Sequence, residues 1–289
     1  MNLQNRIERG LEQAITFATA GGKPPKVCAA VRHAVFPGGA RIRPRLCLAV
    51  ALASGDRNPD AATAAATAIE LLHCASLVHD DLPCFDDSDL RRGRSSVHAE
   101  FGEPLAVLAG DGLIVSAFET LARGCAQAPE TLGPLVTTIG RAVGTPHGLV
   151  AGQAWESEPE IDLRDYHRAK TASLFTGATA AGAIASNADP LKWLELGEAL
   201  GAAYQVADDL RDTAATIEEL GKPVGQDVAH ARPNAVEELG LAGAVTLLQE
   251  TVRKAADAIP ECAGADMLRQ LILGEAKRLV PKKLAQSAA

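Results

Sequence analysis

Two groups of aspartates, each at the end of an apolar stretch, are the residues in this sequence best suited to chemistry. The first group follows the apolar run that begins at Ile69 and consists of Asp80, Asp81, Asp86, Asp87 and Asp89. Three arginines come directly after it: Arg91, Arg92 and Arg94. Carboxylates hold Mg²⁺ through one or two ligands while phosphate oxygens complete the shell, and arginine offers paired donors to phosphate. These charges suit a substrate with an anionic head and an apolar tail, although a solvated acidic loop is the alternative interpretation.

The second group lies far downstream, where Asp208, Asp209 and Asp212 end another apolar stretch. On a helix, Asp208 and Asp212 project from one face and lie one turn apart. Like charges at this spacing repel each other, and bound cations are the simplest reason to keep them there. The two groups together predict facing walls around one site that holds several metal ions.

Length and composition limit the class of protein. The chain has 289 residues without a linker-like segment or a repeat, and its 47% apolar residues allow a sizeable core. Because aromatic residues make up only 3%, that core is built from Ala, Leu, Val and Ile. The net charge of −8 argues against nucleic acid as a partner, since nucleic-acid binding needs a basic face.

Cysteine usage and the absence of a signal-peptide pattern favour a cytoplasmic protein. The six cysteines show no CxxC or zinc-site spacing, so we expect buried thiols in a reducing compartment. The stretch from Thr171 to Ala188 carries no charge and is long enough to raise the question of a membrane span. Its many small and polar residues favour a tightly packed interior helix instead, and we expect no membrane span.

The pattern along the chain predicts an all-α protein. Prolines and glycines divide it into helix-length pieces, and no Val, Thr and Ile clusters are long enough for strands. Most pieces are apolar on more than one face, which indicates a central helix surrounded by others. We expect helices near residues 3–20, 27–35, 41–54, 60–82, 105–126, 131–144, 147–157, 165–188, 191–213, 241–258 and 264–279.

The aspartate groups resemble two motifs of a known family. DDxxxxD (Asp80, Asp81, Asp86) and DDxxD (Asp208, Asp209, Asp212) look like the two aspartate-rich motifs of the trans-isoprenyl diphosphate synthases, or polyprenyl synthetases. Similar fragments cover nearly the whole chain: Gly38–Pro44, Leu108–Asp111, Gly152–Gln153, Lys170–Thr171, Tyr204–Gln205 and Gly221–Lys222. In detail the sequence is most similar to bacterial geranylgeranyl diphosphate synthases of carotenoid and photosynthetic-pigment pathways. The resemblance implies one isoprenoid-synthase domain over residues 1–289, a helical bundle around a deep central cavity, and a homodimer.

The resemblance also implies the substrates and the residues that bind them. Isopentenyl diphosphate is expected at Arg41, Arg43, His73 and Arg92. The allylic partner (dimethylallyl, geranyl or farnesyl diphosphate) is expected at Arg91, Lys170, Thr171, Gln205 and Lys222. Three Mg²⁺ ions are expected on Asp80, Asp86 and Asp208, with help from Asp81, Asp209 and Asp212. His73 lies seven residues before Asp80, so two helical turns place both on one face.

The chemistry implied is electrophilic alkylation. Asp80, Asp86, Asp208, Arg91 and Lys170 are the residues expected to promote ionisation of the allylic diphosphate, because preorganised cations stabilise the charge that develops on the departing diphosphate. The double bond of isopentenyl diphosphate then attacks the allylic cation. In this family the released diphosphate is understood to take the proton, so no general-base side chain is required.

Two departures and one small pair of residues distinguish this chain within the family. The family's usual lysines are replaced by Ala40 and Gln226, which removes two expected phosphate contacts. Ala75 and Ser76, just before the first motif, are both small, whereas members that stop at fifteen carbons commonly have an aromatic side chain at this depth. We therefore expect geranylgeranyl diphosphate as the product. Phe118 and Leu71 are candidates for the floor of the tail pocket.

Other functions remain to be distinguished. Ala75 could be mere helix filler, with another wall limiting the product to farnesyl diphosphate. A class I terpene cyclase uses the same metals but usually pairs one aspartate motif with an Asn/Ser/Glu motif, and DDLRD stands there instead. A non-catalytic regulatory subunit fits the lost lysines, although such a subunit is expected to lose aspartates first, and all of them are retained.

Overall fold

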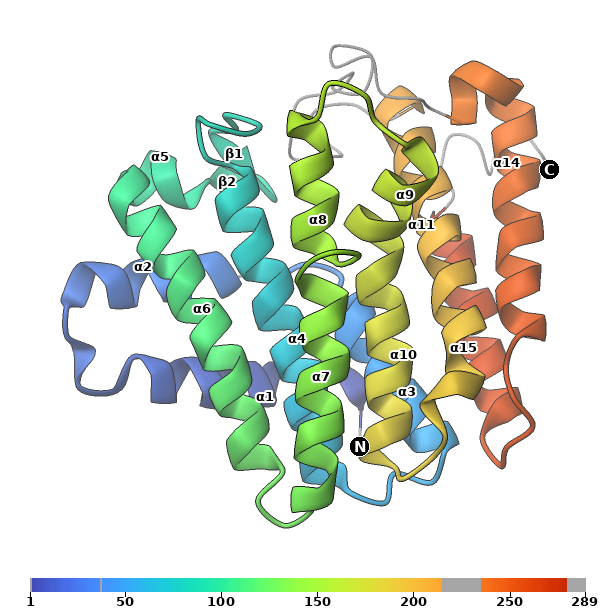
Figure 1. Cartoon of the computed structure of the whole chain (residues 1–289), viewed down its shortest axis with the longest axis horizontal. Coiled ribbons are helices and arrows are strands. Elements are labelled where there is room, and N and C mark those ends of the chain that lie inside the picture. Colours follow the sequence, from blue (N-terminus) through green and yellow to red (C-terminus); the bar gives the residue numbers. More distant parts are fainter. Residues whose placement is uncertain (1, 37, 215–234, 280–289) are drawn as a thin grey trace. The chain divides into compact units, whose positions relative to one another are not determined.

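The computed structural model describes residues 2–36, 38–214 and 235–279, and Figure 1 shows them as a succession of helices joined by short turns. The first helices are α1 (Leu3–Ala18), α2 (Pro25–Val35), α3 (Ile42–Ala53), α4 (Pro59–Asp80), α5 (Val97–Phe101) and α6 (Glu103–Gly124). The later helices are α7 (Leu132–Val143), α8 (Leu149–Ala154), α9 (Leu163–His167), α10 (Ser173–Ala185), α11 (Leu194–Ala214), α14 (Ala235–Asp257) and α15 (Ala265–Leu279). The prediction of an all-α protein is confirmed.

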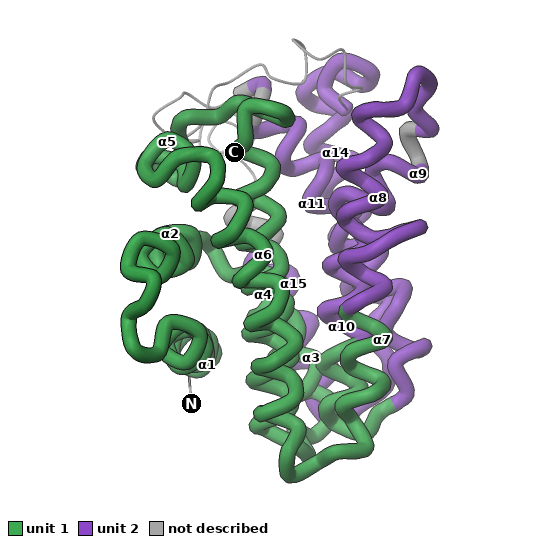
Figure 2. The backbone as a smooth tube through the Cα atoms, turned by 60° about the vertical axis from the view of Figure 1, so that its left-hand side comes forward, with its two compact units in different colours: residues 1–139, 181–188 green, residues 140–180, 189–289 purple. Residues whose placement is uncertain are grey.

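Two compact units make up the chain, and Figure 2 colours them separately. One unit consists of residues 1–139 and 181–188, and the other consists of residues 140–180 and 189–289. The single domain over residues 1–289 stays a prediction. The first aspartate group belongs to the first unit, and the second group belongs to the second unit.

Helix α4, which leads to the first aspartate group, is the core of the first unit. It starts with Pro59 at its first turn, where a missing N–H costs little, and its alanine-rich middle is buried. Helix α6 packs along it (Figure 1), and the two helices approach closely at Gly110 and Gly124. A Cβ at Gly110 would collide with the His79 ring, and one at Gly124 would collide with Ala64. Small residues at these two positions therefore set the spacing of α4 and α6.

Helices α4 and α6 are also long and apolar enough to cross a membrane by length and composition. In α4, 78% of the apolar window is buried, as in the core helix of a globular unit. In α6 the buried share is 39%, because its outer face exposes Val107, Leu108 and Val115. The absence of a membrane span stays a prediction.

The structure differs from the sequence-based expectation in a few local elements. Two-residue strands, β1 (Leu90–Arg91) and β2 (Arg94–Ser95), form a hairpin, and α5 follows it directly. Elements this short carry no period that a sequence pattern can reveal. The helix expected over 165–188 is divided into α9, a π-helical turn (Arg168–Ala172) and α10. Helix α14 consists of two helical segments, one from Ala235 and one after Gly240, joined across a kink at this glycine (φ +67°, ψ +168°); only the second segment was expected.

Candidate active site

The first aspartate group folds back on the end of α4. The Asp86 N–H donates to the carbonyl of Asp80 (3.0 Å), and the Asp87 N–H donates to the carbonyl of Leu82 (3.1 Å). Asp87 adopts φ of +46°, a left-handed conformation that aspartate tolerates better than most residues. These bonds bring the backbone of Asp86 beside Asp80, while Pro83 and the exposed Cys84 loop outward. The longer spacing of this motif thus still places two carboxylate residues next to each other.

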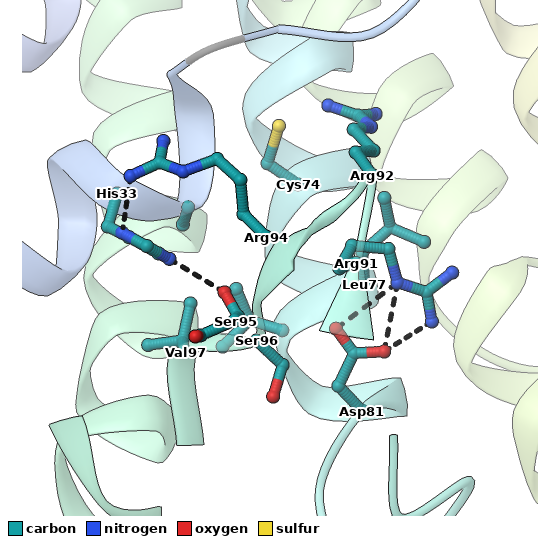
Figure 3. A pocket seen from close by; sticks show the side chains of 12 residues that line it. His33, Cys74, Leu77, Asp81, Arg91, Arg92, Arg94, Ser95, Ser96 and Val97 are labelled. Atoms are coloured by element: carbon teal, nitrogen blue, oxygen red, sulfur yellow. Dashed lines mark hydrogen bonds and ion pairs between the residues drawn. The ribbon is translucent and has the colours of Figure 1, made fainter. Parts of the chain in front are cut away.

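Asp81 points to a different partner. It is buried, and the Arg91 guanidinium donates to both of its carboxylate oxygens, with Nε at 2.9 Å from Oδ1 and 3.2 Å from Oδ2. Burial raises the pKa of Asp81 even though the arginine opposes the shift. Burial alone would lower the pKa of Arg91. The hydrogen bonds and the charge of Asp81 act against burial, and the pKa of the guanidinium lies above its ordinary value. The pair ties β1 to the end of α4 and fixes Arg91 beside the first motif (Figure 3).

Arg92 lies at the tip of the hairpin. Leu90 pairs with Ser95 and Arg91 with Arg94, so Arg92 and Gly93 form a two-residue turn with φ of +55° and +74°. The loop between α2 and α3 lies against its side chain, because a Cβ at Gly39 would come within 2.7 Å of the Arg92 Cζ. Arg92 forms no salt bridge with any residue in the described part of the chain. Its charge is therefore available to an anionic ligand.

Arg43 and His73 lie together, as expected for two residues of one phosphate site. Arg43 Nη1 is 3.4 Å from His73 Nε2, which joins α3 to α4. Burial lowers the pKa of His73 well below its usual value, and the charges of Arg43, Arg92 and other nearby arginines lower it further. A neutral imidazole can accept a hydrogen bond from Arg43. Close by on α4, Ala75 is buried and the Ser76 hydroxyl donates to the carbonyl of His73 (2.8 Å).

Arg41 has partners inside the protein. Its guanidinium is buried and donates to Glu70 (Nη1 to Oε1, 2.6 Å), Glu8 (Nε to Oε1, 3.1 Å) and the carbonyl of Val35 (2.9 Å). Burial opposes the charged form, but Glu70 raises the pKa of Arg41 above its ordinary value. The residue joins α1, α4 and the end of α2, with φ of +51° at the start of α3. Its role as a phosphate ligand stays a prediction.

The two described side chains of the second aspartate group differ in exposure. Asp208 is exposed and accepts from Arg211 Nη1 (2.8 Å) one turn later. Asp209 is buried and accepts from the side-chain amide of Gln205 (3.0 Å) and from the Ala235 N–H at the start of α14 (2.9 Å). The Thr171 hydroxyl donates to the other end of the Gln205 amide (2.9 Å). Thr171, Gln205 and Asp209 therefore form one hydrogen-bonded chain.

Lys170 lies on the π-helical turn and is held by α8 and the turn that follows it. A side chain at Gly152 would collide with the Lys170 backbone, so glycine permits the close approach. The Lys170 ammonium pairs with Glu156, which also accepts from the Tyr166 hydroxyl (2.6 Å) and the Gln153 amide (3.0 Å). No role for Glu156 was predicted from the sequence, because a lone glutamate fourteen residues from Lys170 gives no periodic signal.

The side chains of two residues of the predicted site are not among those that the structure describes. Lys222 is outside the described residues, and the Asp212 side chain is as well, although its backbone belongs to α11. Among the described residues, no three His, Cys, Asp or Glu side chains converge closely enough to hold a metal by themselves. Mg²⁺ is usually held by one or two carboxylates together with substrate phosphates, and the paired Asp80 and Asp86 and the exposed Asp208 are donors of that kind. The donor sets therefore fit a metal that binds together with a diphosphate.

A small pocket beneath the hairpin contains residues that no sequence motif singled out. His33 of α2, Cys74 of α4 and Ser96 before α5 line it, together with all three arginines of the hairpin (Figure 3). Burial raises the pKa of the Cys74 thiol to about 12, so this thiol stays protonated and packs as a small apolar group. His33 and Arg94 contact each other here, although 61 residues separate them in the sequence.

Comparison with known proteins places this geometry in context. Residues 24–262 match the family model of the polyprenyl synthetases. The chain is 50% identical over 285 residues to a geranylgeranyl diphosphate synthase of Cereibacter sphaeroides, and the alignment covers 99% of both chains. It is 49% identical over 272 residues to the geranylgeranyl diphosphate synthase of Rhodobacter capsulatus, covering 94% of each chain.

A solved structure agrees with these matches. The geranyltransferase of Helicobacter pylori, in complex with magnesium and isoprenyl diphosphate, superposes with a TM-score of 0.78 at 27% identity. The match covers 96% of this chain and 98% of that one. The fold is therefore that of the isoprenoid synthases, as the sequence resemblance implied.

Proposed function

Because the chain belongs to the polyprenyl synthetase family, we propose that it is a short-chain trans-prenyltransferase that condenses isopentenyl diphosphate with allylic diphosphates. The observation that carries the proposal is the retention of both aspartate groups, each accompanied by cations from its own unit. Arg91 and Arg92 follow the first group in the sequence, and Lys170 precedes Thr171, whose hydrogen bond to Gln205 connects it to Asp209 of the second group. A protein that only bound another subunit would have no need for this set.

Mg²⁺ is the proposed cofactor, with three ions on Asp80, Asp86 and Asp208. When bound, these ions supply the positive charge that stabilises the departing diphosphate. The folding of Asp86 onto Asp80 and the exposure of Asp208 support their assignment as direct ligands. Asp81 and Asp209 are engaged by Arg91 and by the start of α14, so their proposed part is to hold the neighbouring ligands in place. Asp212 completes the second motif.

Isopentenyl diphosphate is proposed to bind at Arg43, His73 and Arg92. The contact of Arg43 with a neutral His73 supports this assignment, and so does Arg92, which forms no salt bridge with another residue of the ranges that the structure describes. Arg41 belongs to the same predicted set, and its ion pairs with Glu8 and Glu70 hold the loop that precedes α3. These residues orient the homoallylic double bond for attack.

The allylic diphosphate is proposed to bind at Arg91, Lys170, Thr171, Gln205 and Lys222. Lys170 and Arg91 add positive charge where the diphosphate departs, which favours ionisation of the carbon–oxygen bond. Thr171 fixes the orientation of the Gln205 amide, and Gln205 fixes Asp209. The double bond of isopentenyl diphosphate then attacks the allylic cation, and the released diphosphate takes the proton.

The proposed product is geranylgeranyl diphosphate. Its support is the pair of small residues, Ala75 and Ser76, one and a half turns before the first motif, and the names of the two relatives reported above. We propose a cytoplasmic enzyme that supplies carotenoid-type pathways. The exposed apolar side chains of α6 (Val107, Leu108 and Val115) support a homodimer that uses this face.

One turnover assay separates the candidate functions. Labelled isopentenyl diphosphate is incubated with dimethylallyl, geranyl or farnesyl diphosphate, with Mg²⁺ or with a chelator, and the dephosphorylated products are separated. The proposal predicts a Mg²⁺-dependent C20 alcohol. A C15 alcohol as the final product would instead identify a farnesyl diphosphate synthase. Unlabelled hydrocarbon from the allylic substrate would identify a cyclase, and no turnover with any primer would identify a regulatory subunit.

A further inference from the structure

The turn that carries Arg92 is held in an unfavourable backbone conformation. Arg92 and Gly93 both have positive φ, +55° and +74°, as the tightest hairpin turns require. Glycine adopts this conformation readily, but an arginine does so only where its surroundings hold it in place. The structure therefore has to provide contacts that fix this turn.

Arg94, on the second strand, provides two of these contacts. Its Nη1 donates to the carbonyl of Phe36 (2.9 Å), and its Nη2 lies 3.3 Å from His33 Nδ1. His33 Nε2 lies 2.8 Å from the carbonyl of Ser95, which returns the connection to the hairpin (Figure 3). A carbonyl can only accept and a guanidinium can only donate, so the hydrogen of His33 is on Nε2 and Nδ1 accepts from Arg94. His33, Phe36, Arg94 and Ser95 thus form a closed set of contacts, which we call the clasp.

The clasp joins the same two segments that meet at Arg92. On one side, Arg94 holds the hairpin to the end of α2 at Phe36. On the other side, Gly39 of the following loop lies so close to the Arg92 guanidinium that a Cβ there would come within 2.7 Å of Cζ. Loosening the clasp would let the hairpin and the loop move apart, and Arg92 would then lose the surface against which it rests.

We propose that Arg94 and His33 are positioning residues that act through Arg92, holding its guanidinium where the diphosphate of isopentenyl diphosphate binds. The inference rests on the proposed use of Arg92 for that substrate. It adds two residues to the isopentenyl site that do not touch the substrate. It also gives a reason for the position of His33, since a ring that only packed edge-on against Phe101 (centroids 5.3 Å apart) would need no nitrogen atoms.

Steady-state kinetics with purified full-length variants test the clasp. Arg92→Ala sets the scale and is expected to raise the KM for isopentenyl diphosphate roughly ten- to a hundredfold, as for loss of a charge-assisted hydrogen bond. Arg94→Ala and His33→Phe are each expected to raise the same KM about three- to tenfold, while kcat and the KM for farnesyl diphosphate stay within about twofold. His33→Phe keeps the ring packing on Phe101 and removes both hydrogen bonds. Arg123→Ala is the matched control, because Arg123 stacks on Phe17 (3.7 Å) away from the hairpin.

The double variant Arg92→Ala/Arg94→Ala decides whether Arg94 acts through Arg92. If it does, Arg94→Ala changes the KM by less than about twofold when Arg92 is already absent. A full additional effect would mean that Arg94 contacts the substrate itself and would overturn the proposal.

Three further results would also overturn it. The clasp would have no positioning role if Arg94→Ala and His33→Phe behaved like Arg123→Ala. A lowered melting temperature together with a lower kcat and an equal rise in both KM values would show that the clasp only stabilises the fold. An unchanged KM in Arg92→Ala would refute the assignment of Arg92 as well, whereas a raised KM in that variant alone would refute only the clasp.

Discussion

Replacing Glu70 by glutamine should destabilise the protein strongly, because it leaves the buried charge of Arg41 without its main partner. The two side chains are 0% and 2% exposed, and Arg41 Nη1 lies 2.6 Å from Glu70 Oε1. Breaking a buried pair by removing one partner costs about 3–5 kcal/mol, since the remaining charge stays desolvated. Glu8 still accepts from Arg41 Nε, but its side chain is 37% exposed. We therefore expect the lower end of this range, about 3 kcal/mol.

Urea denaturation followed by circular dichroism measures this loss directly. Glu12→Gln is the control, because the Glu12–Arg32 pair is half-exposed (49% and 51%) and such pairs contribute less than about 1 kcal/mol. The double variant Arg41→Met/Glu70→Leu should recover most of the stability, since well-packed apolar residues often replace a buried pair at little cost. If Glu70→Gln costs no more than Glu12→Gln, the pair does not hold this loop. If the double variant is stable but its KM for isopentenyl diphosphate rises more than tenfold, the result supports the predicted role of Arg41 as a phosphate ligand.

Three further predictions concern the substrate site. The lowered pKa of His73 means that unfolding takes up a proton below the ordinary value of 6.5, so the free energy of unfolding should fall as the pH falls below that value. Between about pH 8 and pH 5, the denaturant midpoint should fall less steeply with falling pH in His73→Gln than in the wild type. An equal pH dependence in the two proteins would contradict the lowered pKa of His73. Ala40→Lys should lower the KM for isopentenyl diphosphate, because a charge-assisted contact contributes up to about 1.5–3 kcal/mol to the binding free energy if the lysine reaches the phosphate; an unchanged KM would show that the arginines already satisfy it. Ala75→Phe should shift the main product from C20 to C15 by filling a level roughly 7–8 Å below Asp80, and chromatography showing farnesol from both proteins would refute the proposed product.

The helices could be predicted because their causes are local. Prolines at helix starts and long runs of Ala, Leu and Val mark α4 and α6 within a few residues of their observed ends. The all-α class follows from the same pattern. The helix expected from residue 241 does begin after Gly240, whose backbone angles (φ +67°, ψ +168°) are not helical, but a second helical segment from Ala235 directly precedes it. A glycine with positive φ usually ends a helix, and this one ends the short segment that begins at Ala235, which the sequence pattern did not indicate.

The contacts around the site could not be predicted in the same way, because they join residues distant in sequence. The Arg41–Glu70 pair spans 29 residues, and the contact of Arg94 with Phe36 involves a backbone carbonyl, which has no sequence signature. Sequence motifs indicate neither contact, and they predict only a phosphate-binding role for Arg41. No motif indicates a role for Glu156 either, although it accepts hydrogen bonds from Lys170, Tyr166 and Gln153. The motifs thus identified candidate ligands, and the fold revealed what supports them.

The claim that both aspartate groups hold Mg²⁺ during the reaction is tested most directly by substituting one aspartate from each. The rate of isopentenyl diphosphate incorporation is measured against Mg²⁺ concentration for the wild type, Asp80→Asn, Asp208→Asn and the control Asp87→Asn. Asparagine tolerates the left-handed backbone of Asp87, so the control should keep its fold and rate. We predict that Asp80→Asn and Asp208→Asn each lose at least about a hundredfold in kcat, with unchanged circular dichroism and no rescue by added Mg²⁺. A near-normal rate and Mg²⁺ dependence in either variant would contradict the account.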